Sequence, residues 1–128
     1  MADQTNRVIV CITNQMQCTH LIHAGEELAK THCADLYMLS VQPRISQSWQ
    51  SNVLEHLYYM ACQANADMTV VYDDNPAAVI VRFLREHKPQ YVVINGLPHS
   101  PMHTALQARF PDISFVVVQP EQVKDTGT

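Results

Sequence analysis

Two hydrophobic patterns alternate along the chain. Short apolar runs rich in β-branched residues are typical of strands buried on both faces of a parallel sheet, and they occur at residues 8–12, 35–41, 68–72, 91–94 and 113–119. Between these runs, apolar residues recur every three or four positions, which is the period of a helix that packs on one side. This second pattern predicts helices at residues 20–31, 48–65, 76–87 and 102–110.

The regular alternation of strands and helices predicts the architecture. With right-handed crossovers it gives an α/β fold in three layers, a doubly wound sheet of five parallel strands in the order 3-2-1-4-5 with helices on both faces. Ligands of such sheets bind outside the carboxyl ends of the strands, where the strand order reverses. We therefore expect any binding site at the loops 13–18, 42–48, 73–75 and 96–101.

Composition and charge narrow the class of protein. The 128 residues are 47% hydrophobic and 16% charged, as in a folded domain, which we place at residues 1–120 with a disordered tail at 121–128. The net charge is -4 and the 8 Lys and Arg residues are scattered, so we expect no nucleic-acid partner. The apolar runs are shorter than the ~20 residues that span a bilayer, and the N-terminal segment is polar. We expect a cytoplasmic location and no membrane insertion.

Four stretches carry a resemblance to a known family. They are RVIVCITN at residues 7–14, ADLYMLSV at 34–41, FLREHKPQYVVING at 83–96 and PDISFVVV at 111–118. In these stretches the chain resembles the universal stress protein (UspA-like) family, and within it the universal-stress-like domain of potassium-responsive sensor kinases of the KdpD type. The resemblance implies a universal stress protein, or adenine nucleotide alpha hydrolase-like, fold over nearly the whole chain.

The resemblance also implies where a ligand would bind. ATP-binding members of the family have an Asp after the first strand, a Val that ends the second, and glycine-rich elements that cradle the phosphates. Asn14 stands at the position of the Asp and Val41 matches the Val, but Gly96 is followed by LPHSP, without a second glycine. Prolines supply no N–H group to a phosphate. By this comparison the candidate ligand-binding residues are Thr13, Asn14, Val41, Gly96 and Ser100.

Two functions follow from these residues. The favoured one is a non-catalytic stress-response or signalling domain that acts through dimerisation or partner contacts, such as a sensor kinase, without ATP or another cofactor. The alternative is a receptor that binds an adenine nucleotide, namely ATP, AMP or a cyclic dinucleotide, at the carboxyl ends of the first and fourth strands. Of the pattern shared by relatives that bind cyclic dinucleotides, Tyr37 and the hydroxyl of Thr13 carry over.

The sequence contains no signature of catalysis. It lacks a serine nucleophile elbow, a Walker loop and a Gly-x-Gly-x-x-Gly fingerprint, so we expect no enzyme. Asp73 and Asp74 precede a helix start at Asn75-Pro76, which favours helix capping over a catalytic pair of carboxylates.

Histidines and cysteines raise the question of a metal or redox site. His20 and His23 are three residues apart, whereas a helical zinc pair is better placed at four, so we expect surface histidines and no metal. Without a Cys-x-x-Cys pair, the cysteines are expected to be reduced. Cys18 is either a redox-sensitive thiol at a helix start or an inert small residue, and Cys11 and Cys62 are expected in the core.

Two groups of apolar residues could either pack the core or form a contact surface. Trp49, Tyr58 and Tyr59 lie on or beside the second predicted helix, where they either pack the core or cover a ligand crevice, and packing is the preferred interpretation. The fifth strand is a sheet edge in the predicted order, and an uncharged apolar edge requires a cover. Because many universal stress proteins pair their last strands, the resemblance implies a homodimer whose interface contains Ile113, Phe115, Val116, Val117 and Val118.

Overall fold

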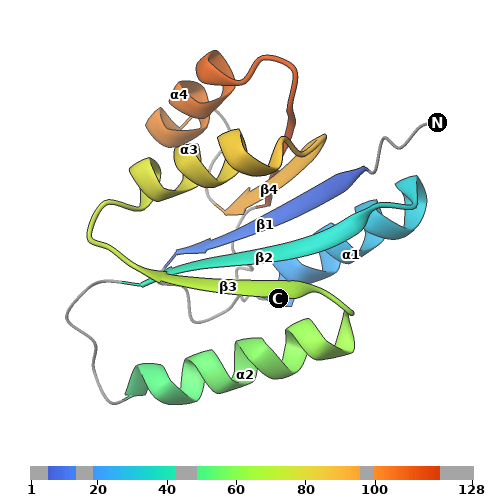
Figure 1. Cartoon of the computed structure of the whole chain (residues 1–128), viewed down its shortest axis with the longest axis vertical. Helices are drawn as coiled ribbons and strands as arrows, with labels where there is room; N and C mark the ends of the chain where they lie inside the picture. The colour runs from blue at the N-terminus through green and yellow to red at the C-terminus, as the bar shows by residue number, and fades with distance from the viewer. Residues whose placement is uncertain (1–5, 14–18, 43–48, 96–99, 119–128) are drawn as a thin grey trace, which may run out of the picture.

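A computed structural model describes residues 6–13, 19–42, 49–95 and 100–118. In these ranges five strands alternate with four helices (Figure 1). The strands are β1 (Arg7–Thr13), β2 (Asp35–Gln42), β3 (Asp67–Tyr72), β4 (Tyr91–Asn95) and β5 (Ser114–Val118). The helices are α1 (Thr19–His32), α2 (Trp49–Gln63), α3 (Pro76–His87) and α4 (Pro101–Arg109). The predicted order of elements is confirmed, with boundaries that agree with those expected to within two residues.

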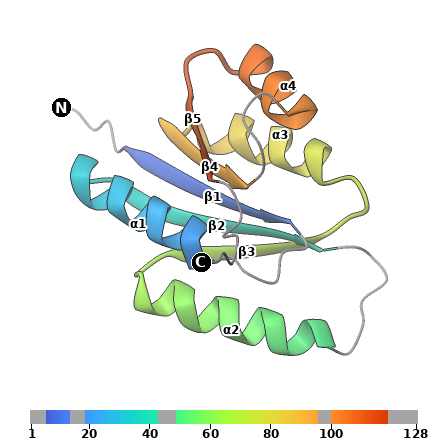
Figure 2. The ribbon, with the colours of Figure 1, turned by 180° about the vertical axis from the view of Figure 1, so that it is seen from behind.

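The strands form one parallel sheet in the order β3-β2-β1-β4-β5. Helices α1 and α2 cover one face, and α3 and α4 cover the other (Figures 1 and 2). The predicted three-layer fold is therefore correct. None of the helices in the described part of the chain is long and apolar enough to cross a membrane.

Each face of the sheet has its own hydrophobic core, because successive side chains of a strand point to opposite faces. Val8, Val10 and Ile12 of β1 pack with α1 and α2. Ile9 and Cys11 of the same strand pack with α3 and α4. All five side chains are at most 3% exposed, as expected for a central strand that is buried on both faces.

Local signals set the ends of the helices. The side chain of Asn75 accepts a hydrogen bond from the N–H group of Ala78, 3.3 Å away, and Pro76 opens α3. Helix capping is confirmed at this position. At the other end of three helices the chain turns through a residue with positive φ, namely Cys33, Asn65 and Lys88. These residues take the left-handed conformation that commonly terminates helices.

Gly25 allows α1 to lie directly on the sheet. A Cβ atom at this position would collide with Cγ2 of Val10 and would lie 3.2 Å from Cδ1 of Leu36. Both neighbours are buried strand residues, and Val10 is completely so. The helix can therefore be this close to β1 and β2 only because residue 25 has no side chain.

Three expectations about the second helix are wrong. Cys62 is exposed, and Tyr58 and Tyr59 are 63% and 61% exposed, so none of them belongs to the core. Helix α2 packs on the sheet through Leu57 and Ala61, which lie one turn apart. Tyr58 and Cys62 directly follow Leu57 and Ala61, and Tyr59 lies two positions after Leu57. Residues one or two positions apart on a helix point in different directions, so these three side chains point away from the sheet.

Gly25→Ala is expected to destabilise the protein. Overpacking in a core costs about 1–3 kcal/mol, which exceeds the gain of about 1 kcal/mol in helix propensity from replacing glycine with alanine. Chemical denaturation should show a net loss of stability on the order of 1 kcal/mol. Glu27→Ala, on the exposed side of the same helix, should change the stability by less than about 0.5 kcal/mol.

A double-mutant cycle identifies the cause. If the Val10 methyl group is the obstacle, Gly25→Ala should cost less in a Val10→Ala background than in the unchanged protein. An equal cost in both backgrounds, or a gain in stability in the unchanged protein, would show that the helix moves freely to accommodate the methyl group.

Candidate functional site

The strand order reverses between β1 and β4. The chain leaves β1 through α1 toward β2 and β3, and α3 then carries it back to β4, on the other side of β1. At the carboxyl ends of these two strands the connecting segments diverge to opposite faces of the sheet, which is where doubly wound proteins bind ligands. This edge is therefore the candidate site.

The sheet register places the strand ends that border the site. Thr13, the last residue of β1, is the parallel partner of Val41 in β2. Asn95, the last residue of β4, is paired with Val118 in β5. The backbone N–H group of Asp73 donates to the carbonyl oxygen of Gln42 at 2.8 Å, which fixes the exit of β3 to the end of β2.

A buried polar pair lies close to this edge. Ser40 is completely buried and Gln42 is 3% exposed, and Nε2 of Gln42 donates to Oγ of Ser40 at 2.8 Å. Strand alternation puts both side chains on the face where Leu36 and Met38 pack with α1 and α2. The hydrogen bond matters because an unpaired polar group in such a position would lose its hydration without compensation.

Two helices begin at the same edge. Because α3 and α4 follow β3 and β4, their N-termini lie beside the carboxyl ends of the strands, and helix N-termini favour anions. The hydroxyl of Ser100 accepts a hydrogen bond from the N–H group of His103 at 3.2 Å. At α3, the N–H group of Asn75 donates to Oδ1 of Asp73 at 2.9 Å. Both side-chain oxygens are thus acceptors for their own helix starts, and the hydroxyl of Ser100 keeps its O–H donor.

The predicted ligand-binding residues can be located in part. Thr13 and Val41 lie side by side in register, with Val41 buried against the α3 and α4 side. Ser100 is the N-cap of α4. Asn14 and Gly96 fall outside the described residues. A ligand-binding role for the five residues stays a prediction.

Sequence inspection missed Ser40 and Gln42. The signal that could have found them is the alternation along β2, where Leu36, Met38, Ser40 and Gln42 share one face. Two polar residues on a face that is otherwise apolar indicate a buried hydrogen-bonded pair.

The cysteines and histidines that the structure describes form no cluster that could hold a metal ion. Cys11 is buried, as expected, and its burial raises the pKa of the thiol to about 12, so it stays protonated and unreactive at neutral pH. Cys18 lies outside the described residues. His20 and His23 are exposed, as predicted. Among the residues that the structure describes, no group of three or more His, Cys, Asp and Glu side chains could hold a metal ion.

Ser40→Ala should lower the stability of the protein although the side chain becomes smaller and less polar. The substitution leaves the buried amide of Gln42 without its acceptor, at an expected cost of about 1–3 kcal/mol by chemical denaturation. Adding Gln42→Met, which removes the amide as well, should recover part of that loss. The control is Ser114→Ala at the exposed start of β5. If Ser40→Ala costs no more than this control, the hydrogen bond contributes nothing to stability.

Comparison with solved structures finds similar proteins over most of the chain. A protein of the universal stress protein family from Burkholderia pseudomallei is 16% identical, with a TM-score of 0.62 over 88% of this chain and 95% of the other. The universal stress protein from Archaeoglobus fulgidus in complex with dAMP is 10% identical, with a TM-score of 0.64 over 89% and 97%. A family protein from Arabidopsis thaliana with AMP bound is 13% identical, with a TM-score of 0.61 over 91% and 92%.

No protein-family model matches the chain, and no curated protein matches its sequence. The likeness to the solved structures is therefore one of architecture, since the identities are low while the coverage is nearly complete. The sheet order and the helices on both faces agree with it. The chain has the universal stress protein fold, which is adenine nucleotide alpha hydrolase-like.

Proposed function

We propose that this chain is a non-catalytic, cytoplasmic stress-response or signalling domain of the universal stress protein type that acts as a homodimer. The likeness of its fold to universal stress proteins supports the class of function. The main support for a dimer comes from β5. This strand lies at the edge of the sheet, and its apolar side chains are only partly buried in their own chain.

The residues of β5 are arranged as an interface would require. Phe115 and Val117 touch the core on the α3 and α4 side, and Val116 and Val118 touch the core on the other side. All four are only partly buried, and β4 pairs with one side of the strand. The backbone N–H and C=O groups of such an uncharged edge strand can pair with a strand of another chain. A second copy that pairs antiparallel across a two-fold axis would close the assembly at two subunits.

Ile113 differs from the other residues predicted for the interface. It precedes β5, is 8% exposed and packs in the core of its own chain on the α3 and α4 side. The proposed interface therefore rests on residues 115–118, and Ile113 supports the strand from within.

Val117→Lys should convert the dimer into monomer. A lysine on the strand that pairs would bring two like charges near the two-fold axis and would remove apolar contact across it. Sedimentation at tens of micromolar should show the unchanged protein at twice the monomer mass and the variant at the monomer mass, or precipitating.

A matched control lies at the opposite edge of the sheet. Val70 of β3 is 36% exposed, so Val70→Lys places the same charge on the edge strand that the proposal leaves unpaired. This variant should remain dimeric. The interface is wrong if the unchanged protein is a monomer at this concentration, or if Val70→Lys dissociates the dimer while Val117→Lys leaves it intact.

Binding of an adenine nucleotide is the second candidate. Two of the similar structures were solved with dAMP and AMP, and the carboxyl edge between β1 and β4 is where such a ligand would lie. The phosphate side of that edge is poorly equipped, because Pro101 offers no N–H group and the LPHSP segment after Gly96 contains no second glycine. If a nucleotide binds, its base and sugar should contribute more to affinity than its phosphates do.

Thermal unfolding with adenosine, AMP and ATP tests this candidate. Without a phosphate cradle, millimolar ATP should raise the melting midpoint no more than adenosine does. A ligand present at 100 times its dissociation constant would add about 2.7 kcal/mol to stability, which is readily measured. A micromolar dissociation constant that requires the triphosphate would contradict the proposal and would show that other groups replace the glycines.

A more specific proposal is that this chain is a domain of a potassium-responsive sensor kinase. It is supported by the sequence resemblance at residues 111–118, where a Pro-Asp pair is followed by an apolar strand. In that setting the same domain would act through contacts with its kinase rather than with a second copy of itself.

A further inference from the structure

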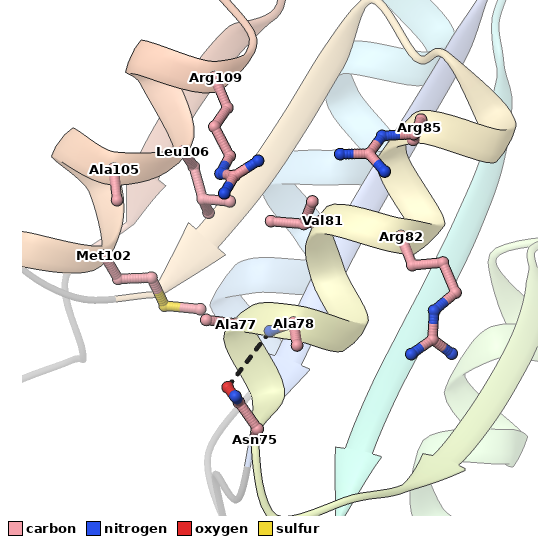
Figure 3. Close-up of a pocket in the computed structure, with 10 residues that line it drawn as sticks. All are labelled: Asn75, Ala77, Ala78, Val81, Arg82, Arg85, Met102, Ala105, Leu106 and Arg109. Atoms are coloured by element: carbon pink, nitrogen blue, oxygen red, sulfur yellow. Dashed lines mark hydrogen bonds between the residues drawn. The ribbon is translucent and has the colours of Figure 1, made fainter.

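A hollow of about 480 Å³ lies between α3 and α4, the two helices that cover one face of the sheet (Figure 3). Its apolar lining comes from both helices and includes Val81 of α3 and Leu106 and Met102 of α4. The volume is in the range of pockets that hold small molecules. The two helices run side by side, so the hollow is a groove between them rather than a gap in the sheet.

Arginines from the two helices face each other across this hollow. Arg85 of α3 and Arg109 of α4 both direct their guanidinium groups toward the space between the helices, while Arg82 points away from it (Figure 3). None of these three arginines pairs with a carboxylate of the described residues. Basic residues are favoured in the last turn of a helix, which accounts for the positions of Arg85 and Arg109 but not for the direction of their guanidinium groups toward one hollow.

Positive charge is concentrated here in a protein that is acidic as a whole. A second hollow of about 420 Å³ adjoins the first through Arg85 and adds Lys88, with Asp112 as its acidic residue. Without Arg82, which points away, the two hollows are lined by 3 of the 8 Lys and Arg residues of a chain whose net charge is -4. A local excess of one charge beside apolar walls attracts ligands of the opposite charge.

The groove begins at the carboxyl edge, where Asn75 and Met102 line it at the starts of α3 and α4, but its arginines lie at the far end, away from the candidate nucleotide site. Arg85 and Arg109 lie in the last turns of α3 and α4, and these helices start at the carboxyl edge of the sheet and run away from it. The second hollow contains Gln90, just before the first residue of β4. The arginines are therefore near the amino ends of the strands.

We propose that the groove between α3 and α4 binds a small organic anion that has an apolar body and one carboxylate, sulfonate or phosphate group. The two guanidinium groups would bind the anionic group through charge-assisted hydrogen bonds, which planar guanidinium donors form in pairs. The apolar body would lie on Val81, Leu106 and Met102. This function goes beyond the proposed dimer and does not depend on it.

The probe is anilinonaphthalene sulfonate, an aromatic sulfonate whose fluorescence rises in apolar surroundings. Titration of the full chain should give saturable binding of one dye per subunit. Arg85→Gln and Arg109→Gln should each weaken binding by about 3- to 10-fold, the range of a partly exposed charge-assisted hydrogen bond. Phenylnaphthylamine, which has the same aromatic body without the sulfonate, should bind more weakly by at least that factor.

Two matched controls separate the groove from general effects. Lys30→Gln removes the same charge from the exposed side of α1, on the other face of the sheet, and should leave dye binding unchanged. Ala105→Phe fills the groove from α4, whereas Ala108→Phe adds the same ring to an exposed position that does not line it. Only Ala105→Phe should abolish binding. Circular dichroism melting curves establish that each variant is folded.

The possible results are decisive in both directions. The proposal is overturned if dye binding is not saturable, if Lys30→Gln weakens it as much as Arg85→Gln and Arg109→Gln do, or if Ala105→Phe binds the dye like the unchanged protein. Equal binding of phenylnaphthylamine would likewise show an apolar surface without anion recognition. The unchanged protein should bind the sulfonate dye more tightly than it binds phenylnaphthylamine, and more tightly than the arginine and Ala105 variants bind the dye. Only a groove that recognises both the anionic group and the apolar body explains this order.

Discussion

The contact between Gly25 of α1 and Val10 of β1 sets the distance between the first helix and the centre of the sheet. β1 is the central strand of the sheet: it is buried on both faces and pairs with β2 on one side and β4 on the other. Helix α1 contacts β1, β2 and β4 from this close position. A side chain at residue 25 would lift the helix from all three strands, and the loop edge where the strand order reverses depends on their alignment.

The two faces of the sheet use polar groups in different ways. On the α1 and α2 side, Ser40 and Gln42 satisfy each other in the core, so that a polar pair is compatible with dense packing. On the α3 and α4 side, Arg85 and Arg109 remain at the surface and lack carboxylate partners among the described residues. A satisfied buried pair maintains structure, whereas converging charges without partners are available to a ligand. This contrast is why we assign binding to the groove and stability to the buried pair.

The fold by itself does not decide the ligand. Similar structures contain dAMP and AMP, yet Pro101 has no N–H donor to offer, and the LPHSP segment after Gly96 contains no second glycine. Function in this fold is carried by particular side chains on a common framework. The edge strand β5 and the groove between α3 and α4 are features of this chain's own residues, and the association and the anion binding proposed for them do not depend on a nucleotide.

The sequence by itself determined the order of elements, the parallel topology and the cap at Asn75, because hydrophobic period, crossover handedness and helix capping are local properties. It also placed Thr13 and Val41 at adjacent strand ends. Only the tertiary structure decided the exposure of Cys62, Tyr58 and Tyr59, because the apolar period indicates the side of α2 that meets the sheet but not how many neighbouring apolar residues are buried with it. It alone brought Arg85 and Arg109 together, since residues 24 positions apart meet only through the packing of two helices on one face.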